Sequence, residues 1–334
     1  MKVSELGEFG LIDLLAKTIA GSPGKEAGQQ LILGIGDDAA AWYGDTSTQL
    51  ATVDSLIQDV HFSLGITPWH ELGWKALAAN LSDIAAMGGM PRYALVSLAL
   101  PDHTEVEDIT ALYQGMIELS RQFNVAIVGG DTSRAPLVII TITVLGITSQ
   151  DNPVLTRSGA KPGDKVAATG CLGTAAASWE MLTKQLRFNS EATACLKEAF
   201  LHPYPRIAEG QLLVEQGVKT AIDISDGLIS DLNHICKASQ VSARIEVERV
   251  PILPTVKANF EGKAHELALS GGEDYELLFT GSVDVINKVK TTASCPVTVI
   301  GEITTAQPSQ VTVVDEKGKP IKIHKAGWEH FTAR

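Results

Sequence analysis

The chain has 334 residues, of which 45% are hydrophobic and 20% charged, and its net charge is −12. This length predicts two domains or one large one, and the composition excludes collagen-like, disulfide-scaffold and wholly disordered proteins. The negative charge opposes binding to nucleic acid or to an anionic membrane, and aromatic residues, at 5%, offer few platforms for base stacking. We therefore expect neither nucleic acid nor a membrane as a partner.

Two further features indicate a cytoplasmic protein. The four cysteines all lie in the second half without a CxxC pair, which is typical of reduced core thiols. Residues 1–21 contain Glu5, Glu8 and Asp13, which interrupt the apolar run that a signal peptide needs, and their pattern predicts an amphipathic helix. The most apolar stretch, 137–147, is shorter than the roughly 20 residues that span a bilayer.

Strand-like and helix-like segments alternate along the chain, which predicts an α/β or α+β fold. In the first half we expect strands at 31–35, 49–55, 92–100, 124–130 and 136–146, and the clearest helices at 69–87 and 105–123. The second of these helices has apolar residues at helical spacing. We therefore expect the helices to cover a sheet.

A segment rich in Pro, Gly, Asn and Asp at 149–164 is typical of a linker, so we place a domain boundary there, after residue 150. The second half begins with a strand at 165–170, a glycine-containing turn and a helix at 174–186. It continues through segments at 220–225, 227–239, 243–250, 275–281 and 297–303 and is also α/β in character.

The segment 34–39, Gly-Ile-Gly-Asp-Asp-Ala, follows a predicted strand and matches the dinucleotide-binding fingerprint. That fingerprint needs a helix whose first turn receives a pyrophosphate, but the residues that follow run through a polar turn into the next strand. Asp37 and Asp38 would also repel a pyrophosphate unless cations intervened. We therefore reject dinucleotide binding here and keep a metal-bridged phosphate as an alternative.

Six aspartates lie at or just beyond apolar, strand-like runs, where the sites of α/β proteins assemble: Asp37, Asp38, Asp54, Asp131, Asp223 and Asp226. Asp83, with Asn80 one turn earlier, lies in a predicted helix that is apolar on nearly every face. Taken singly, each aspartate is typical of a helix cap, a turn or a solvated loop. Two carboxylates ~4 Å apart, however, repel by about 4 kcal/mol and recruit cations.

Oxygen ligands without His or Cys suit a hard cation, and Mg²⁺ binds through one or two carboxylates plus substrate phosphates. The pattern therefore predicts several Mg²⁺ ions that hold a nucleotide, and phosphoryl transfer that depends on positioning and charge neutralisation. The motifs of P-loop proteins and protein kinases are absent, as are HExxH and GxSxG. These absences predict an unusual ATP fold and argue against metalloproteases and serine hydrolases.

Seven motifs stand out along the chain: GIGDDAA (34–40), VDSLIQDVHF (53–62), NLSDIAAMG (80–88), GGDTSR (129–134), TRSGAKPGD (156–164), DISDGLISDL (223–232) and SGGEDYELLF (270–279). Together they resemble the thiamine-monophosphate kinase family. The resemblance runs from about residue 5 to residue 331, and the wider superfamily includes aminoimidazole ribonucleotide synthetase and selenophosphate synthetase.

The resemblance implies an α/β (α+β), two-domain fold of the aminoimidazole ribonucleotide synthetase type that dimerises through its amino-terminal sheets. The amino-terminal domain, 1–150, would bind ATP and Mg²⁺ and form the dimer. The carboxy-terminal domain, 151–334, would complete the nucleotide and substrate site.

Site residues follow from the same resemblance. The Mg²⁺ ligands would be Asp38, Thr52, Asp54, Asp83, Asp131, Asp223 and Asp226, with Asp37 supporting them. The nucleotide contacts would be Tyr113, Gly130, Asp131, Arg157 and Ser225, and the substrate contacts would be His61, Glu273 and Trp328. No side chain is implied as a covalent catalytic group.

Two positions depart from the family pattern. Val53 stands where the family usually has Thr, and Asp59 stands where it commonly has Gly. If residue 53 binds metal through its carbonyl, Val changes little. Asp59 would add negative charge beside His61 and either raise its proton affinity or alter the substrate entrance.

The resemblance implies ATP-dependent phosphorylation of thiamine monophosphate to thiamine diphosphate, by direct in-line transfer of the γ-phosphate with several Mg²⁺ ions. Two alternatives stay open: a sister enzyme with another acceptor, and a non-catalytic nucleotide-binding or scaffold protein. The first cysteine, Cys171, lies too late for the reactive amino-terminal residue of a selenophosphate synthetase. SGGEDYELLF and HKAGWEHF resemble the kinase's substrate side and argue against a ribonucleotide synthetase.

Overall fold

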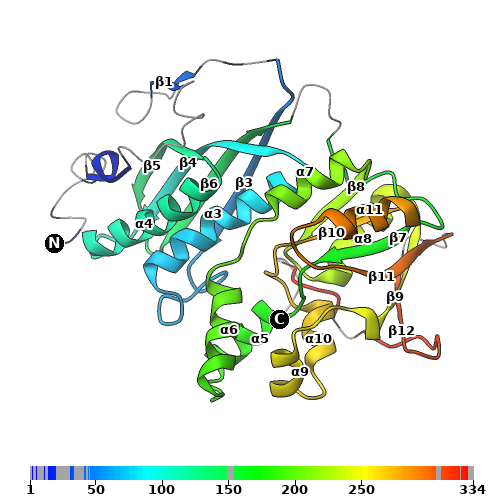
Figure 1. Ribbon diagram of the computed structural model, residues 1–334. Coiled ribbons are helices and arrows are strands. Elements are labelled where there is room, and N and C mark those ends of the chain that lie inside the picture. Colours follow the sequence, from blue (N-terminus) through cyan, green and yellow to red (C-terminus); the bar gives the residue numbers. More distant parts are fainter. Residues whose placement is uncertain are drawn as a thin grey trace. The chain divides into compact units, whose positions relative to one another are not determined.

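The structure is a computed structural model, and it describes residues 2, 5, 11, 14–19, 31–33, 41–42, 44, 46–148, 154–305, 310–323 and 325–329. The chain forms two compact units (Figure 1). The first unit contains Met1–Ile84 and Met90–Gln150, and the second contains Ala85–Gly89 and Asp151–Arg334.

The first unit is built on a four-stranded sheet with the strand order β3-β6-β4-β5. Strands β3 (Gln49–Ile57), β6 (Ile139–Ile147) and β4 (Met90–Leu100) pair antiparallel, and β5 (Ala126–Arg134) pairs with β4 in parallel. A separate two-stranded sheet joins β1 (Leu31–Leu33) to β2 (Ala41–Trp42). In the large sheet, β3 and β5 are therefore the two edge strands.

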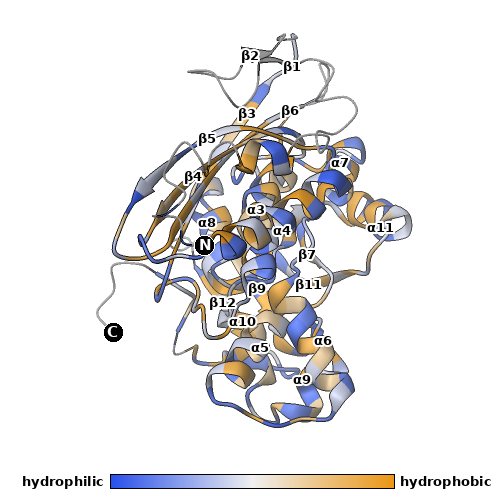
Figure 2. Cartoon of the chain, turned by 90° about the vertical axis from the view of Figure 1, so that its left-hand side faces the viewer, coloured by the Kyte–Doolittle hydropathy of each residue, from blue (hydrophilic) through white to orange (hydrophobic). Residues whose placement is uncertain are grey.

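One face of this sheet carries the apolar core of the first unit. Alternate residues of β6, such as Ile140, Ile142 and Val144, are buried, while the residues between them are partly exposed. Helices α3 (Trp69–Ala86) and α4 (Val106–Gln122) each have a long row of buried, mostly apolar residues. Figure 2 shows β4 mostly in hydrophobic colours, whereas the far end of β5 is hydrophilic.

The second unit is built on a six-stranded sheet with the order β12-β9-β11-β7-β10-β8. All pairs in it are antiparallel except β9 with β12. Its strands are β7 (Lys165–Thr169), β8 (Thr220–Ile224), β9 (Ser242–Glu246), β10 (Glu276–Gly281), β11 (Val297–Thr304) and β12 (Val311–Val314).

Helices pack on this sheet through one large hydrophobic cluster and through a smaller contact with α11. The cluster takes residues from α5 (Thr174–Thr183), α6 (Ser190–Leu201), α8 (Leu228–Ser239), α9 (Pro254–Asn259) and α10 (Ala264–Ser270). Helix α11 (Val283–Thr292) contacts α7 (Ile207–Glu215) and strands β7, β10 and β11. A short 3₁₀ turn, η1 (Val247–Arg249), follows β9.

The predicted α/β class is confirmed, and most predicted elements form within a few residues of their expected bounds. Residues 14–19 are helical, and Leu11, Leu15 and Ile19 are buried at the four-residue spacing of an amphipathic helix. All four cysteines are free, although only Cys236 is fully buried. Among the described residues, no helix has the length and apolar character needed to cross a membrane.

Candidate functional site

The first set of predicted ligands lies between strand β3 and helix α3. Thr52 and Asp54 are two residues apart on β3 and therefore share one face of the sheet, while Asn80 and Asp83 lie one turn apart on α3. The Thr52 hydroxyl donates to a carboxylate oxygen of Asp83 at 2.5 Å, and the backbone N–H of Asp54 donates to the Asn80 amide oxygen at 3.1 Å. Strand and helix thus gather Thr52, Asp54 and Asp83, which we call the β3/α3 group.

His61 lies in a tight turn that follows β3. Its Nδ1 accepts a hydrogen bond from the backbone N–H of Ile57 at 2.9 Å, so the neutral ring carries its proton on Nε2. The backbone N–H of Asp59 donates to the carbonyl of Phe62 at 2.7 Å and closes the turn. The ring of His61 is therefore oriented by the backbone of its own turn.

Asp131 lies on the opposite edge strand, β5. The register places Asp131 opposite Ser97 of β4, Ser97 opposite Thr141 of β6, and Thr141 opposite Ser55 of β3. Because paired residues share a face and neighbours alternate, Asp131 lies on the face of Ser55 and not on that of Asp54. Three strand spacings, about 14 Å, separate the two edges, so one copy of the sheet does not bring Asp131 to the β3/α3 group.

The predicted position of Asp54 and Asp131 at strand ends is wrong. Strand β3 continues to Ile57 because it stays paired with β6, and β5 continues to Arg134 because it stays paired with β4. Gly130 is also held inside this ladder. A Cβ atom there would lie 1.8 Å from the carbonyl oxygen of Val96, so only glycine fits.

Tyr113, a predicted nucleotide contact, lies on the buried side of α4. Its side chain is only 5% exposed, and burial raises the pKa of its hydroxyl well above the ordinary value. A nucleotide contact at this residue would therefore use an uncharged hydroxyl or the ring edge.

In the second unit, Asp223 is the buried penultimate residue of β8, and Ser225 and Asp226 follow directly, as the sequence predicted. One carboxylate oxygen of Asp231 accepts hydrogen bonds from the backbone N–H groups of Asp226, at 3.2 Å, and Gly227, at 3.1 Å. Burial raises the pKa of Asp231 to about 8, and the negative charges of Asp223 and Asp226 add to this effect. We call Asp223, Asp226 and Asp231 the β8/α8 group.

Two predicted substrate contacts lie against the same loop. The backbone N–H of Glu273 donates to the carbonyl of Ser225 at 2.8 Å, and that of Trp328 donates to the carbonyl of Asp226 at 2.9 Å. A Cβ atom on Gly272 would lie 2.3 Å from the Ser225 carbonyl oxygen, so glycine permits this close approach. Residues far apart in the sequence thus meet beside the β8/α8 group.

Arg157 lies near the same helix. Its carbonyl accepts a hydrogen bond from the hydroxyl of Ser239, at the end of α8, at 3.1 Å. Burial lowers the pKa of His234 on α8, the positive charges of Arg157 and Lys237 lower it further, and the charge of Asp226 opposes them. The exposed guanidinium of Arg157 is therefore within electrostatic reach of α8.

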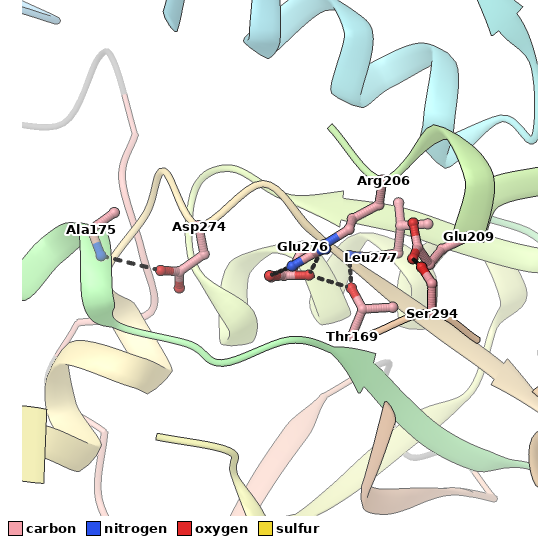
Figure 3. A network of polar contacts seen from close by, with 8 residues as sticks. All are labelled: Thr169, Ala175, Arg206, Glu209, Asp274, Glu276, Leu277 and Ser294. Atoms are coloured by element: carbon pink, nitrogen blue, oxygen red, sulfur yellow. Dashed lines mark hydrogen bonds and ion pairs between the residues drawn. The ribbon is translucent and has the colours of Figure 1, made fainter. Parts of the chain in front are cut away.

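Sequence reasoning missed a polar network in the second unit, drawn in Figure 3. Glu276, at the start of β10, accepts two hydrogen bonds from the guanidinium of Arg206, at 2.6 and 2.7 Å, and one from the hydroxyl of Thr169, at 2.5 Å. Asp274 accepts a bond from the backbone N–H of Gly173 at 2.7 Å, and burial raises its pKa to about 8. Both carboxylates lie within the motif SGGEDYELLF, so the motif was the available signal.

The described residues fit a hard cation. Both groups offer carboxylate or hydroxyl oxygens, and in the β8/α8 group burial, with the charges of Asp223 and Asp226, raises the pKa of Asp231. Oxygen atoms are the ligands that Mg²⁺ prefers. Ligand atoms of Asp226, Asp231 and His234 also lie within 4.8 Å of one another. The other predicted ligand, Asp38, and its neighbour Asp37 lie outside the described residues.

Comparison with known proteins assigns the class first. The model of the AIR synthase related protein, N-terminal domain, matches residues 36–148, and that of the C-terminal domain matches residues 161–314. The chain is therefore a two-domain protein of the AIR synthase related class.

Several relatives define the family more narrowly. The chain is 38% identical to thiamine-monophosphate kinase of Bacillus subtilis, over 90% of this chain and 93% of the relative. A crystal structure of thiamine-monophosphate kinase from Stenotrophomonas maltophilia superposes with a TM-score of 0.80 at 32% identity, covering 93% of this chain and 96% of that one. The structure of AaThiL complexed with AMPPCP and TMP superposes with a TM-score of 0.77 at 34% identity and covers 99% of both chains. The chain belongs to the thiamine-monophosphate kinase family.

Proposed function

We propose that the protein transfers the γ-phosphate of ATP to thiamine monophosphate and forms thiamine diphosphate. The observation that carries this proposal is the group of oxygen donors that β3 and α3 bring together, in a chain that matches thiamine-monophosphate kinases over about nine tenths of its length. The related structure with AMPPCP and TMP supports ATP and thiamine monophosphate as the two substrates.

The chemistry needs little from a nucleophilic side chain. The phosphate of thiamine monophosphate is itself a nucleophile and attacks the γ-phosphorus in line, so the protein has to orient the two anions and offset their charge. Bound Mg²⁺ would supply that charge neutralisation. The β3/α3 group and the β8/α8 group would hold the ions, together with Asp38 and Asp131.

The remaining predicted residues suit the two substrates. Arg157 carries a permanent charge for a phosphate, and Ser225 offers a hydroxyl beside Asp226. Thiamine monophosphate carries a positively charged thiazolium ring, for which Glu273 supplies an opposite charge and Trp328 an aromatic face. His61 would donate from its Nε2–H to an anionic oxygen.

We further propose that the active form is a homodimer joined through the first unit. Asp54 and Asp131 lie on opposite edges and opposite faces of one sheet, so a second copy is needed if both are to meet one nucleotide. The face of β3 opposite Asp54 carries Val53, whose side chain is 59% exposed. An exposed branched apolar residue on an edge strand supports burial against a partner sheet.

The proposal is tested by incubating the protein with ATP, Mg²⁺ and thiamine monophosphate and following phosphorus-31 NMR. We expect the doublets of thiamine diphosphate and ADP to grow, and to stop when Mg²⁺ is chelated. Asp54→Asn should lower turnover by about 100-fold or more while the protein stays folded, whereas Asp284→Asn, an exposed change on α11, should not. Intact ATP in the wild-type reaction, or ADP formed only with another acceptor, would contradict the proposal.

A further inference from the structure

The segment that presents Glu273 has an unusual backbone. Glu273 has φ 68° and Tyr275 has φ 50°, so two residues that carry large side chains adopt the left-handed conformation on either side of Asp274. Side chains with a Cβ atom rarely adopt this region, and such residues persist only where the surrounding structure holds them. The contacts of this segment therefore decide where Glu273 stands.

Backbone hydrogen bonds hold one side of the segment. The N–H of Glu273 donates to the carbonyl of Ser225 at 2.8 Å, and the N–H of Tyr275 donates to the carbonyl of Ile224 at 2.9 Å. These two bonds align the segment with the end of β8. Asp274 lies between the two residues that donate these bonds.

The Asp274 side chain holds the segment from the opposite side. Its Oδ2 accepts the N–H of Gly173 at 2.7 Å, and its Oδ1 lies 3.5 Å from the N–H of Ala175. Gly173 caps α5, and no side-chain hydrogen bond comes from the cap residue itself. Asp274 therefore caps α5 from a distant part of the chain, and Figure 3 shows its carboxylate directed at Ala175.

We propose that Asp274 is a positioning residue for Glu273. By tying the strained segment to the amino terminus of α5, it sets the place of the Glu273 carboxylate and thereby the affinity for the cationic acceptor substrate, without acting on ATP. This inference rests on the proposed function, because the proposed function is what assigns thiamine monophosphate as the ligand of Glu273.

The test compares Asp274→Ala and Asp274→Asn with the wild type in steady-state kinetics for both substrates. We expect Asp274→Ala to raise KM for thiamine monophosphate by about tenfold, and to leave KM for ATP within about twofold of the wild type. Asp274→Asn keeps one oxygen acceptor of the same shape, so it should recover part of the loss. Asp274→Asn also provides the test of the inference if Asp274→Ala does not fold.

A matched control separates positioning from helix capping alone. Asn189 caps α6 by accepting the N–H of Ala192 at 2.7 Å, so Asn189→Ala removes a comparable cap that has no contact with Glu273. It should lower the melting temperature and leave both KM values unchanged. Equal changes of KM in Asn189→Ala and Asp274→Ala would overturn the inference.

A double-mutant cycle shows whether Asp274 acts through its neighbour. In the Glu273→Gln background, Asp274→Asn should change KM for thiamine monophosphate by less than about twofold, since the carboxylate it positions is gone. Independent, multiplicative effects would contradict the inference. A wild-type protein without turnover on thiamine monophosphate would instead refute the proposed function, so the two failures are distinguishable.

Discussion

Asp59 occupies the left-handed backbone region, with φ 63°, in the turn that orients His61. Glycine, which the resemblance implies at this position, adopts such φ values without steric cost. Aspartate is one of the few other residues that tolerate the conformation. Val53, the other position that departs from the expected pattern, has an exposed side chain on the face opposite Thr52 and Asp54.

The backbone of this turn predicts the order of stability among variants of Asp59. Asp59→Ala should unfold with a free energy about 1 kcal/mol lower than Asp59→Gly, because alanine pays the full steric cost of the left-handed region. Urea denaturation followed by circular dichroism measures the difference. Asp59→Asn should stay near the wild type, and equal stability of the alanine and glycine variants would contradict this explanation.

The sequence indicates a candidate site residue only where its chemical type contrasts with that of its neighbours along the chain. Asp54, Asp83 and Asp223 stand out because each is a charged residue in an apolar run. Asp231 and Asp274 do not stand out. Asp231 accepts hydrogen bonds from the nearby backbone N–H groups of Asp226 and Gly227, and Asp274 accepts one from Gly173, far away in the sequence. A hydrogen bond from a backbone N–H to a carboxylate leaves no periodic signal.

Secondary-structure elements were predicted better in position than in length. Strands β3 and β5 extend beyond their apolar cores, because ladder partners in β6 and β4 continue to pair with the polar residues. Helices α6, α7 and α11 were not predicted. Two of them nevertheless begin at a residue type typical of helix N-caps, because Asn189 caps α6 and Ser282 caps α11. The short α9 and α10 depend on packing in the large hydrophobic cluster.

The Arg206–Glu276 pair joins the beginning of α7 to the beginning of β10, and its removal should destabilise the second unit. The two side chains are 19% and 9% exposed, and the pair is bidentate. Arg206→Met leaves the Glu276 carboxylate buried without its cationic partner, so we expect the free energy of unfolding to fall by about 3–5 kcal/mol. Urea denaturation checks this value.

A more exposed ion pair of the same sheet provides the control. Lys165 and Glu302 lie 3.1 Å apart with side chains 33% and 37% exposed, so Lys165→Met should cost less than about 1 kcal/mol. If both substitutions lower the stability equally, burial is not what makes the Arg206–Glu276 pair important.

The arrangement of strands in the molecule changes where its site can lie. In an all-parallel sheet, carboxylates at the carboxyl ends of strands converge on one edge. Here the described strand pairs are antiparallel except β4 with β5 and β9 with β12. The predicted ligands Thr52, Asp54 and Asp131 therefore lie along strands, and of these Thr52 and Asp54 lie on the face that contacts α3. Sequence reasoning selected these aspartates as candidates but could not place Asp54 and Asp131 on opposite edges, because register is set by long-range pairing.

This separation predicts that inactive variants rescue one another in a dimer. If Asp54 of one copy and Asp131 of the other serve the same nucleotide, a mixed dimer of Asp54→Asn and Asp131→Asn chains has one intact site and one doubly altered site. Random assortment makes half of the dimers mixed, so co-expression or joint refolding should restore about a quarter of the wild-type activity. Light scattering confirms the dimeric mass before and after mixing.

The matching control combines Asp54→Asn with Asp83→Asn. These two residues belong to the β3/α3 group of a single chain, linked through Thr52 and Asn80, so every site in the mixed dimer keeps one defect and activity should stay low. Recovery in the control would mean that Asp54 and Asp83 of one chain do not serve the same site. No recovery in the Asp54 and Asp131 mixture would mean that each chain completes its own site. In that case the edge-to-edge separation of about 14 Å within one sheet would have to be closed by a change in the sheet itself.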